Sequence, residues 1–314
     1  MIVTVTPNPS FDRTVAVDEL EVGEVHRIRS AQTEAGGKGV NVSRALALGG
    51  VENTCIFPAN ERDAVIFTEL LGQHAGLRVD VVDIQGSIRT NTSIIESAGR
   101  TTKLNESGPE LDTHELLNLI DAVASGGTNA TWIAVCGSLP PGAGSDFTRR
   151  IIEHAHGTGT RVAIDASGDP LAQAVAGKCH LIKPNHEELA ELVGRELHSL
   201  GDVADAATEV QQSGIEIVVV SLGADGALLV SEHGQIHGVA PVDVVRNTVG
   251  AGDAFLAGFL STGDGGAQSL SEALAWGRAA VQSAATSSPP AADADRAAVR
   301  LSDTIDRSIQ VGHQ

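Results

Sequence analysis

The sequence Gly250-Ala251-Gly252-Asp253 joins a short polar loop to an apolar helical pattern near the C-terminus. Backbone N–H groups in the first turn of a helix have no partner within the helix and lie at the positive end of its dipole, so they attract anions. The carboxylate of Asp253 stands at the same point, where it could accept the proton of an attacking hydroxyl. Amides that hold a phosphoryl group beside such a base suit phosphoryl transfer. A tight loop followed by a capping Asp would give the same residues.

A second glycine-rich loop, Gly36-Gly37-Lys38-Gly39, precedes another helical pattern. Its spacing matches neither the nucleotide P-loop nor the dinucleotide fingerprint. Four further segments carry the motifs TVTPNPSFD at 4–12, CGSLPPG at 136–142, KPNHEEL at 183–189 and SLGADGA at 221–227. Taken in their order along the chain, the six motifs together resemble the signatures of the phosphofructokinase B branch of the ribokinase-like sugar kinases. The resemblance runs through nearly the whole chain.

Apolar strand-like runs alternate with helical patterns, which predicts a mostly parallel sheet covered on both faces, with sites at the carboxyl ends of its strands. The expected strands are 2–6, 53–57, 132–135, 161–165, 180–182 and 216–221, and the expected helices are 40–48, 64–73, 114–124, 146–155, 187–193 and 203–212. Three antiparallel strands are expected after them, at 226–231, 235–240 and 242–246. Residues from 287 onward read as a linker to a short final helix.

Two early stretches, 12–28 and 89–105, break this alternation and are long for loops inside a compact domain. Their pattern predicts a β elaboration built from two non-adjacent segments. The resemblance implies one ribokinase-like α/β kinase domain over 1–314, in which a three-layer α/β/α body carries these inserts as a small β-sheet lid over the sugar. It also implies that two lids often pair in a homodimer.

The resemblance further implies roles for the residues that would handle the nucleotide. Asp253 would be the general base, with the amides of Gly250, Ala251 and Gly252 on the moving phosphoryl group. A helix-start carboxylate is expected to have a low pKa. Glu188, with Asn185, would organise Mg²⁺, and Asp165 would be a further acidic contributor, through water. The remaining expected contacts to ATP are Lys183, Ser221, Gly223 and Gly226. A solvated helix start explains Asn185 and Glu188 otherwise, and a β-turn explains Gly226.

On the sugar side, Asp12 would accept hydrogen bonds from hydroxyls, Gly37 would allow close backbone approach, and Asn41 offers both a donor and an acceptor. The candidates for a phosphate on the substrate itself are Lys38, Arg89 and Ser138, because guanidinium and ammonium groups bind phosphate oxygens. The alternative for Arg89 is a surface arginine of the lid. Several cations at the distal end of the acceptor favour a sugar phosphate over a neutral sugar or nucleoside.

The sequence therefore predicts an ATP- and Mg²⁺-dependent kinase of hexose phosphates that works by direct in-line transfer. Within the branch, the segments 6–14, 23–27 and 103–109 most resemble enzymes that phosphorylate fructose 1-phosphate at its 6-hydroxyl. Kinases of tagatose 6-phosphate or fructose 6-phosphate share almost all of these motifs and remain alternatives. A sugar-phosphate sensor without catalysis is an alternative of another class, although it should have lost Asp253 or the glycines.

The amino-acid composition bears on which partners and which cellular compartment to expect. The net charge of −19 disfavours nucleic acid and anionic membranes. The chain has no run of 18 uncharged apolar residues, and its three cysteines form no CxxC pair, so we expect a cytoplasmic protein without a disulfide framework.

Overall fold

The computed structural model describes residues 1–144, 146–283 and 290–312. The strands of its larger sheet are β1 (Ile2–Val5), β4 (Asn53–Ala59), β5 (Leu77–Asp83), β8 (Trp132–Cys136), β9 (Arg161–Asp165), β10 (Leu181–Ile182), β11 (Ile217–Ser221), β12 (Ala227–Ser231), β13 (Gly234–Val239) and β14 (Arg300–Ser302). They lie in the order β14-β13-β12-β11-β10-β9-β8-β1-β4-β5. Pairing is parallel from β5 to β11 and antiparallel from β11 to β14.

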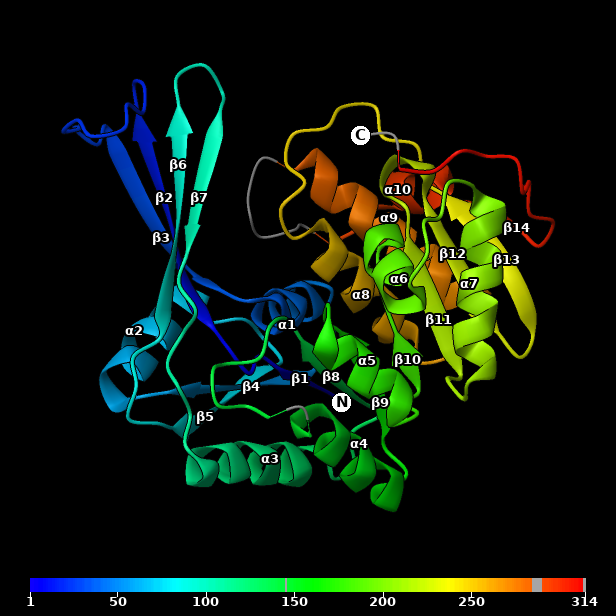
Figure 1. The fold of residues 1–314 in the computed structure, drawn as a ribbon, viewed down its shortest axis with the longest axis horizontal. Coiled ribbons are helices and arrows are strands. Elements are labelled where there is room, and N and C mark those ends of the chain that lie inside the picture. Colours follow the sequence, from blue (N-terminus) through cyan, green and yellow to red (C-terminus); the bar gives the residue numbers. More distant parts are fainter. Residues whose placement is uncertain (145, 284–289, 313–314) are drawn as a thin grey trace.

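Helices cover both faces of this sheet and form the outer layers (Figure 1). One face carries α3 (Thr113–Gly127), α4 (Phe147–Thr158), α5 (Asp169–Ala176), α6 (His186–Val193) and α7 (Leu200–Gln212). The other carries α1 (Lys38–Leu48), α2 (Glu61–Leu71), α8 (Ala251–Thr262) and α9 (Ala267–Gln282), with α10 (Asp293–Ala298) against α9. Strands such as β1 and β8 are buried along their whole length, as parallel strands between two helical layers must be. The predicted three-layer α/β/α fold is confirmed.

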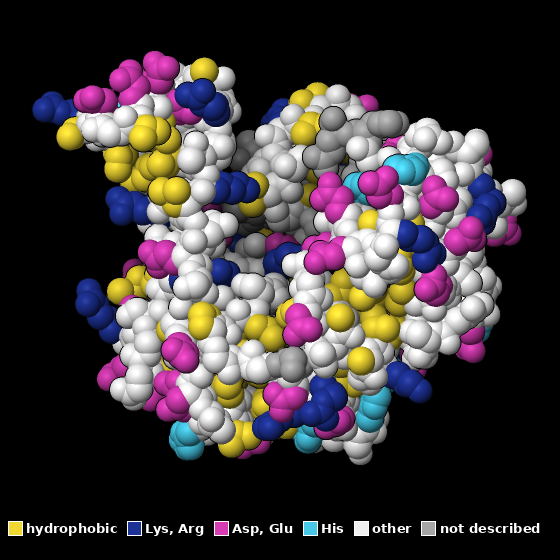
Figure 2. Space-filling view, in the orientation of Figure 1, with side chains coloured by type: hydrophobic (Ala, Val, Ile, Leu, Met, Phe, Trp, Pro, Cys, Tyr) yellow, Lys and Arg dark blue, Asp and Glu magenta, His cyan; other side chains and the backbone are white. Residues whose placement is uncertain are grey.

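A separate four-stranded sheet rises from the body beside a cleft (Figures 1 and 2). Its strands are β2 (Ser10–Val17), β3 (Ser30–Gly36), β6 (Arg89–Glu96) and β7 (Thr101–Asn105), in the order β3-β2-β6-β7. We call these four strands and the loop between β2 and β3 the lid. Strands β2 and β6, far apart in sequence, pair in parallel at its centre. The first lid segment spans 10–36 and is longer than the expected 12–28, because β3 follows its loop.

The third antiparallel strand expected at 242–246 is wrong. The N–H groups of Arg246 and Asn247 both donate to the carbonyl oxygen of Val281 near the end of α9, so this segment is tied to a helix rather than to the sheet. The edge of β13 is instead occupied by β14. The short final helix is confirmed as α10, although β14 follows it; residues 287–289 of the expected linker lie outside the described residues.

Among the described helices, none is long and apolar enough to cross a membrane.

Candidate active site

The N-termini of α1 and α8 converge at the carboxyl ends of the central strands, where the two helices pack together. Gly250 precedes α8 with a φ of 77°, a left-handed conformation that glycine adopts without steric cost. This turn places Asp253 in the first turn of α8. The amide of Asn41 on α1 donates to Oδ2 of Asp253 at 2.8 Å. The predicted phosphoryl-holding amides and the predicted base therefore lie together.

Asp253 is only 7% exposed. Burial and the negative charge of Asp165 raise its pKa to about 6, against the opposing effects of the Asn41 hydrogen bond and of Lys38 and Lys183. The low pKa expected for a helix-start carboxylate is therefore wrong. Desolvation and a like charge outweigh the helix dipole at this position.

Asp165, the last residue of β9, is 1% exposed and lies between two lysines. Its Oδ1 accepts a hydrogen bond from Nζ of Lys38 at 2.8 Å, and its Oδ2 lies 3.1 Å from Nζ of Lys183. Burial alone would raise the pKa of Asp165, but the two lysines outweigh it and lower that pKa. Burial alone would likewise lower the pKa of Lys38, but Asp165, with Glu188 and Asp253 beyond it, raises it.

The residues predicted to meet the nucleotide lie mainly at the carboxyl ends of β10 and β11. Asn185 and Glu188 form a capping box at the start of α6, in which each side chain accepts a hydrogen bond from the other's backbone N–H, at 2.7 and 2.9 Å. The N–H of Ser221 donates to the carbonyl of Pro184, which joins the two strand ends. A β-carbon added at Gly252 would lie 3.8 Å from Nζ of Lys183, so the start of α8 borders the same place.

The two glycines after β11, Gly223 and Gly226, differ in their surroundings. Gly226 has a φ of 87°, and a β-carbon there would collide with the carbonyl oxygen of Gly238 on the neighbouring strand. The β-turn alternative considered for Gly226 is therefore sufficient, and we assign it no nucleotide contact. Gly223 has a φ of 61° and faces open space.

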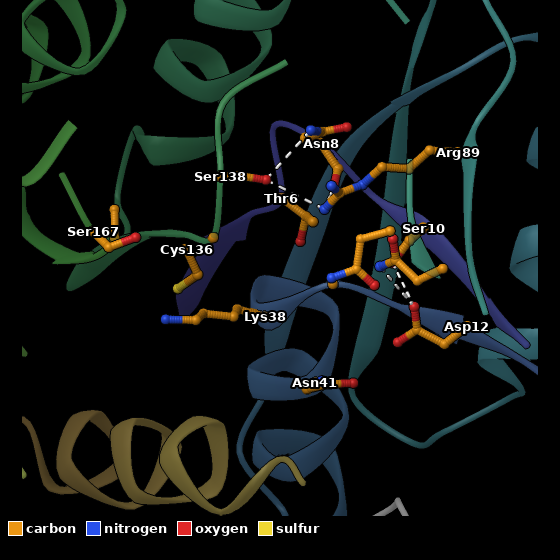
Figure 3. A pocket seen from close by; sticks show the side chains of 15 residues that line it. Thr6, Asn8, Ser10, Asp12, Lys38, Asn41, Arg89, Cys136, Ser138 and Ser167 are labelled. Atoms are coloured by element: carbon orange, nitrogen blue, oxygen red, sulfur yellow. Dashed lines mark hydrogen bonds between the residues drawn. The ribbon is translucent and has the colours of Figure 1, made fainter. Parts of the chain in front are cut away.

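A cavity of about 450 Å³ lies between the lid and the strand ends, and all six predicted sugar-side residues line it (Figure 3). Those six are Asp12, Gly37, Lys38, Asn41, Arg89 and Ser138. The other lining residues, for which no role was expected, are Thr6, Asn8, Ser10, Asn91, Asn105, Cys136, Gly137, Ala166 and Ser167. Asn8 and Ser10 precede Asp12 at intervals of two, and this spacing along an extended chain was the signal that could have found them.

Arg89 and Ser138 lie together at one part of this cavity. The guanidinium donates to the carbonyl of Asn8 at 3.1 Å, to that of Glu106 at 3.1 Å and to Oγ of Ser138 at 3.3 Å. Arg89 is therefore a fixed lining residue and not a loose surface arginine. Lys38 extends away from this pair (Figure 3) and donates to Asp165. Of the three residues expected to bind one phosphate, Arg89 and Ser138 therefore lie together, and the ammonium group of Lys38 lies apart from them.

Asp12 is oriented by its neighbours. Its Oδ1 accepts hydrogen bonds from Ser10 at 2.7 Å and from Asn91 at 3.2 Å. These contacts hold the carboxylate at the cavity wall, where its remaining oxygen can accept from a hydroxyl. At Gly37, with a φ of 117°, a β-carbon would lie 2.6 Å from Cγ2 of Thr6, so the close approach that this glycine permits is to Thr6.

Among the described residues of the site, the oxygen ligands that suit a divalent cation lie at the start of α6. Among the described residues, no three His, Cys, Asp or Glu side chains are grouped so that they could hold a metal ion. Mg²⁺ commonly takes one or two protein carboxylates and completes its shell with water and substrate phosphates, so Glu188 with Asn185 fits. Asp165 does not fit, because its two oxygens already face two ammonium groups.

Solved structures show the class of fold. The chain superimposes on a ribokinase from Arabidopsis thaliana with a TM-score of 0.76, covering 92% of this chain and 95% of that one, at 22% identity. This likeness shows the fold alone, which is ribokinase-like. Phosphofructokinase-2 from Escherichia coli, in its complex with fructose-6-phosphate, matches with a TM-score of 0.84 and 32% identity, over 95% of this chain and 97% of the other.

Sequence comparison identifies the family within this class of fold. The model of the pfkB family of carbohydrate kinases matches residues 6–294. A curated relative described as 1-phosphofructokinase, from Haloferax volcanii, is 36% identical over 269 residues, which cover 85% of each chain. The chain belongs to the pfkB family of carbohydrate kinases. It is a phosphotransferase that acts on a sugar, as the glycine-rich motifs predicted.

Proposed function

We propose that this kinase transfers the γ-phosphoryl group of ATP to the 6-hydroxyl of fructose 1-phosphate and so forms fructose 1,6-bisphosphate and ADP. The observation that carries the chemistry is the hydrogen bond of 2.8 Å that the Asn41 amide donates to the buried carboxylate of Asp253 at the start of α8. Asn41 also lines the sugar cavity, so an acceptor hydroxyl bound beside it lies close to the carboxylate.

In this mechanism, Asp253 accepts the proton of the sugar hydroxyl while the hydroxyl oxygen attacks phosphorus. A pKa of about 6 leaves the carboxylate ionised at neutral pH yet more basic than an ordinary aspartate. The amides at the start of α8 and the ammonium groups of Lys38 and Lys183 stabilise the charge on the phosphoryl oxygens. The bond to the departing ADP oxygen breaks in the same step.

The donor side would be formed by Lys183, Ser221 and Gly223 around the ATP phosphates. Glu188 and Asn185 would hold Mg²⁺, which would neutralise negative charge on the ATP phosphates when bound. In the absence of a metal, Glu188 and Asn185 stabilise the start of α6 through the capping box.

The acceptor is inferred from the cavity and from the relative. Arg89, fixed by three hydrogen bonds and beside Ser138, offers a planar donor group suited to a phosphate at the end of the sugar away from Asp253. Asp12 offers an acceptor for the sugar hydroxyls between these ends. The relative described as 1-phosphofructokinase supports fructose 1-phosphate, while the Escherichia coli structure with fructose-6-phosphate keeps that isomer as the second candidate.

The test is ADP release with ATP and Mg²⁺ and four acceptors in parallel: fructose 1-phosphate, fructose 6-phosphate, tagatose 6-phosphate and free fructose. We expect the highest kcat/KM with fructose 1-phosphate. Asp253→Asn should lower kcat by about 10²- to 10⁴-fold, and Asp169→Asn, at an exposed position on α5, should leave it unchanged. Preference for a 6-phosphate would keep the mechanism and overturn the substrate, whereas a fully active Asp253→Asn would overturn the base.

We also propose that the protein forms a homodimer through the lid. Five large apolar side chains of the lid are exposed: Val22, Val25, Ile28, Ile95 and Leu104. Several exposed large apolar side chains on a protruding sheet are typical of an interaction site, and a second copy of the chain would cover them.

A further inference from the structure

The mechanism proposed above uses the ammonium groups of Lys38 and Lys183. It gives no role to the carboxylate of Asp165, which lies between them. Building on the proposed kinase activity, we propose that Asp165 is a positioning residue that holds the ammonium groups of Lys38 and Lys183 beside the phosphoryl group in transfer, and that it is not a magnesium ligand. The family resemblance had instead implied that this carboxylate contributes to Mg²⁺ binding through water.

The backbone around Asp165 is fixed by the sheet. Asp165 pairs with Cys136 on β8, and its carbonyl accepts from the N–H of Gly137 at 2.8 Å. On the other side, the N–H of Lys183 donates to the carbonyl of Ile164 at 3.1 Å. Asp165 and Lys183 thus stand next to each other on adjacent strand ends, and neither can move without disturbing the sheet.

The two lysines approach from different sides of the site. Lys38 is the first residue of α1 and lines the sugar cavity, whereas Lys183 is 5% exposed and borders the start of α8 at Gly252. Lysine has a long flexible stem, so its ammonium group acts at a defined point only when a partner holds it. One buried carboxylate holds both, with Nζ distances of 2.8 and 3.1 Å.

Charge distinguishes positioning from metal binding. One carboxylate between two ammonium groups leaves a net positive charge, which attracts phosphoryl oxygens and repels a divalent cation. The 1% exposure of Asp165 also leaves no open side for a hydrated ion. The carboxylate therefore acts on the reaction through the lysines, by fixing donors before the charge develops.

The kinetic test compares Asp165→Asn with the matched control Asp169→Asn, four residues further on and exposed. Asp165→Asn should lower kcat by about 10- to 100-fold, with little change in the KM of either substrate, and excess Mg²⁺ should not restore it. Lys183→Met in the same background should add little further loss, because the two side chains act as a unit. Recovery of activity at high Mg²⁺, or a loss confined to the KM of Mg-ATP, would overturn the proposal in favour of a metal ligand.

A second measurement needs no turnover. Lysines of the protein are acetylated competitively with acetic anhydride at mildly alkaline pH, and the modified fraction of each is read by mass spectrometry. In the wild type, Lys38 should react slowly, because Asp165 keeps it protonated; Asp253 and Glu188, which also act on Lys38, stay in place in both variants. Asp165→Asn should make Lys38 several-fold more reactive, while Lys103 on the lid serves as an internal reference.

Unchanged labelling of Lys38 in Asp165→Asn would show that the carboxylate does not hold it, and would overturn the proposal. If the wild type turned over none of the hexose phosphates, the proposed function would fail on its own. The labelling would then still decide whether Asp165 holds the lysine.

Discussion

At the scale of single residues, Asp253 shows how a reactive group is obtained at a cost in stability. Its carboxylate is buried beside Asp165, and both conditions favour the protonated form. The folded protein therefore binds a proton at Asp253 more tightly than the unfolded chain does. A base of this strength is useful near neutral pH, but its ionised form opposes folding.

This opposition predicts that Asp253→Asn is more stable than the wild type at neutral pH. The pKa of Asp253 is about 6 in the folded protein and near the ordinary 3.8 in the unfolded chain. The group thus stabilises the fold only while it is protonated, and that contribution is lost as pH rises from about 4 to about 6. The full difference corresponds to about 3 kcal/mol. The Asn41 hydrogen bond can persist, since asparagine also offers an acceptor oxygen.

Denaturant unfolding of both proteins at a series of pH values measures this effect. The stability advantage of Asp253→Asn should be largest above pH about 6 and should vanish below pH about 4. Asp169→Asn should differ from the wild type by less than about 0.5 kcal/mol throughout. An Asp253→Asn variant that is less stable than the wild type at neutral pH would contradict the raised pKa.

The sequence predicted individual site residues correctly where they belong to a recognisable motif. Asp12, Asn41 and Arg89 belong to short segments with recognisable order, and all three line the cavity. It did not find the partner of Lys38, which lies 127 positions away in Asp165. Such a pairing is set by which strand ends become neighbours, and so is the pKa of a buried carboxylate.

At the scale of elements, the position of the proposed base depends on how closely α8 packs against α9. Gly258 faces α9 at the point of nearest approach. A β-carbon there would lie 2.7 Å from the carbonyl oxygen of Glu272 and 2.9 Å from Cγ of Trp276. Both contacts are shorter than van der Waals distance, so any larger residue must push the helices apart.

Gly258→Ala should therefore lower the free energy of unfolding by about 1 to 3 kcal/mol, although alanine favours helix more than glycine does. The matched control is Gly157→Ala in α4, where a β-carbon meets nothing within 4 Å. That substitution should raise stability by about 0.5 to 1 kcal/mol. Urea unfolding followed by circular dichroism compares the two, and equal effects of both substitutions would refute the packing argument.

The elements that the sequence predicted are those with a strong local signal. The strands and helices that were predicted from clear periods lie within a few residues of the observed ones, whereas the strand β5 and the helices α5 and α9 were not predicted. A further failure lies at the sheet margin. The segment 242–246 has the valines of a strand, but Val244 and Val245 are exposed, while the three-residue β14 completes the edge. Which segment occupies a sheet edge is decided by tertiary packing and not by strand propensity.

At the scale of the whole molecule, the charge distribution reconciles a net charge of −19 with phosphorylated substrates. The chain has four lysines, and two of them, Lys38 and Lys183, meet at Asp165. Figure 2 shows basic side chains in the hollow between lid and body, while acidic side chains are scattered over the rest of this face. A cleft lined by cations inside an acidic surface attracts anions locally.

The lid stands away from the body and exposes large apolar side chains. It is a four-stranded sheet with β3 and β7 as outer strands, and it projects from the body (Figure 1). Large apolar side chains on its strands and on the β2–β3 loop remain exposed, including Val25 and Leu104. A stable protein–protein interface buries about 1,200 to 2,000 Å², and mutual packing of two lids would cover these side chains on both copies at once.

We therefore expect light scattering after size exclusion to give twice the chain mass of 32.3 kDa. A charge at a buried apolar contact costs about 2 kcal/mol or more at an interface centre. Val25→Asp and Leu104→Asp should accordingly shift the equilibrium toward monomer by about tenfold or more in Kd. Leu117→Asp is the control, because this exposed leucine lies on α3, on the opposite side of the body from the lid. A dimer that only Leu117→Asp dissociates would move the interface away from the lid, and a monomeric wild type at the concentrations of the assay would exclude the dimer. If the lid variants are monomeric and also lose affinity for the sugar phosphate, pairing of the lids is part of how the cavity is closed.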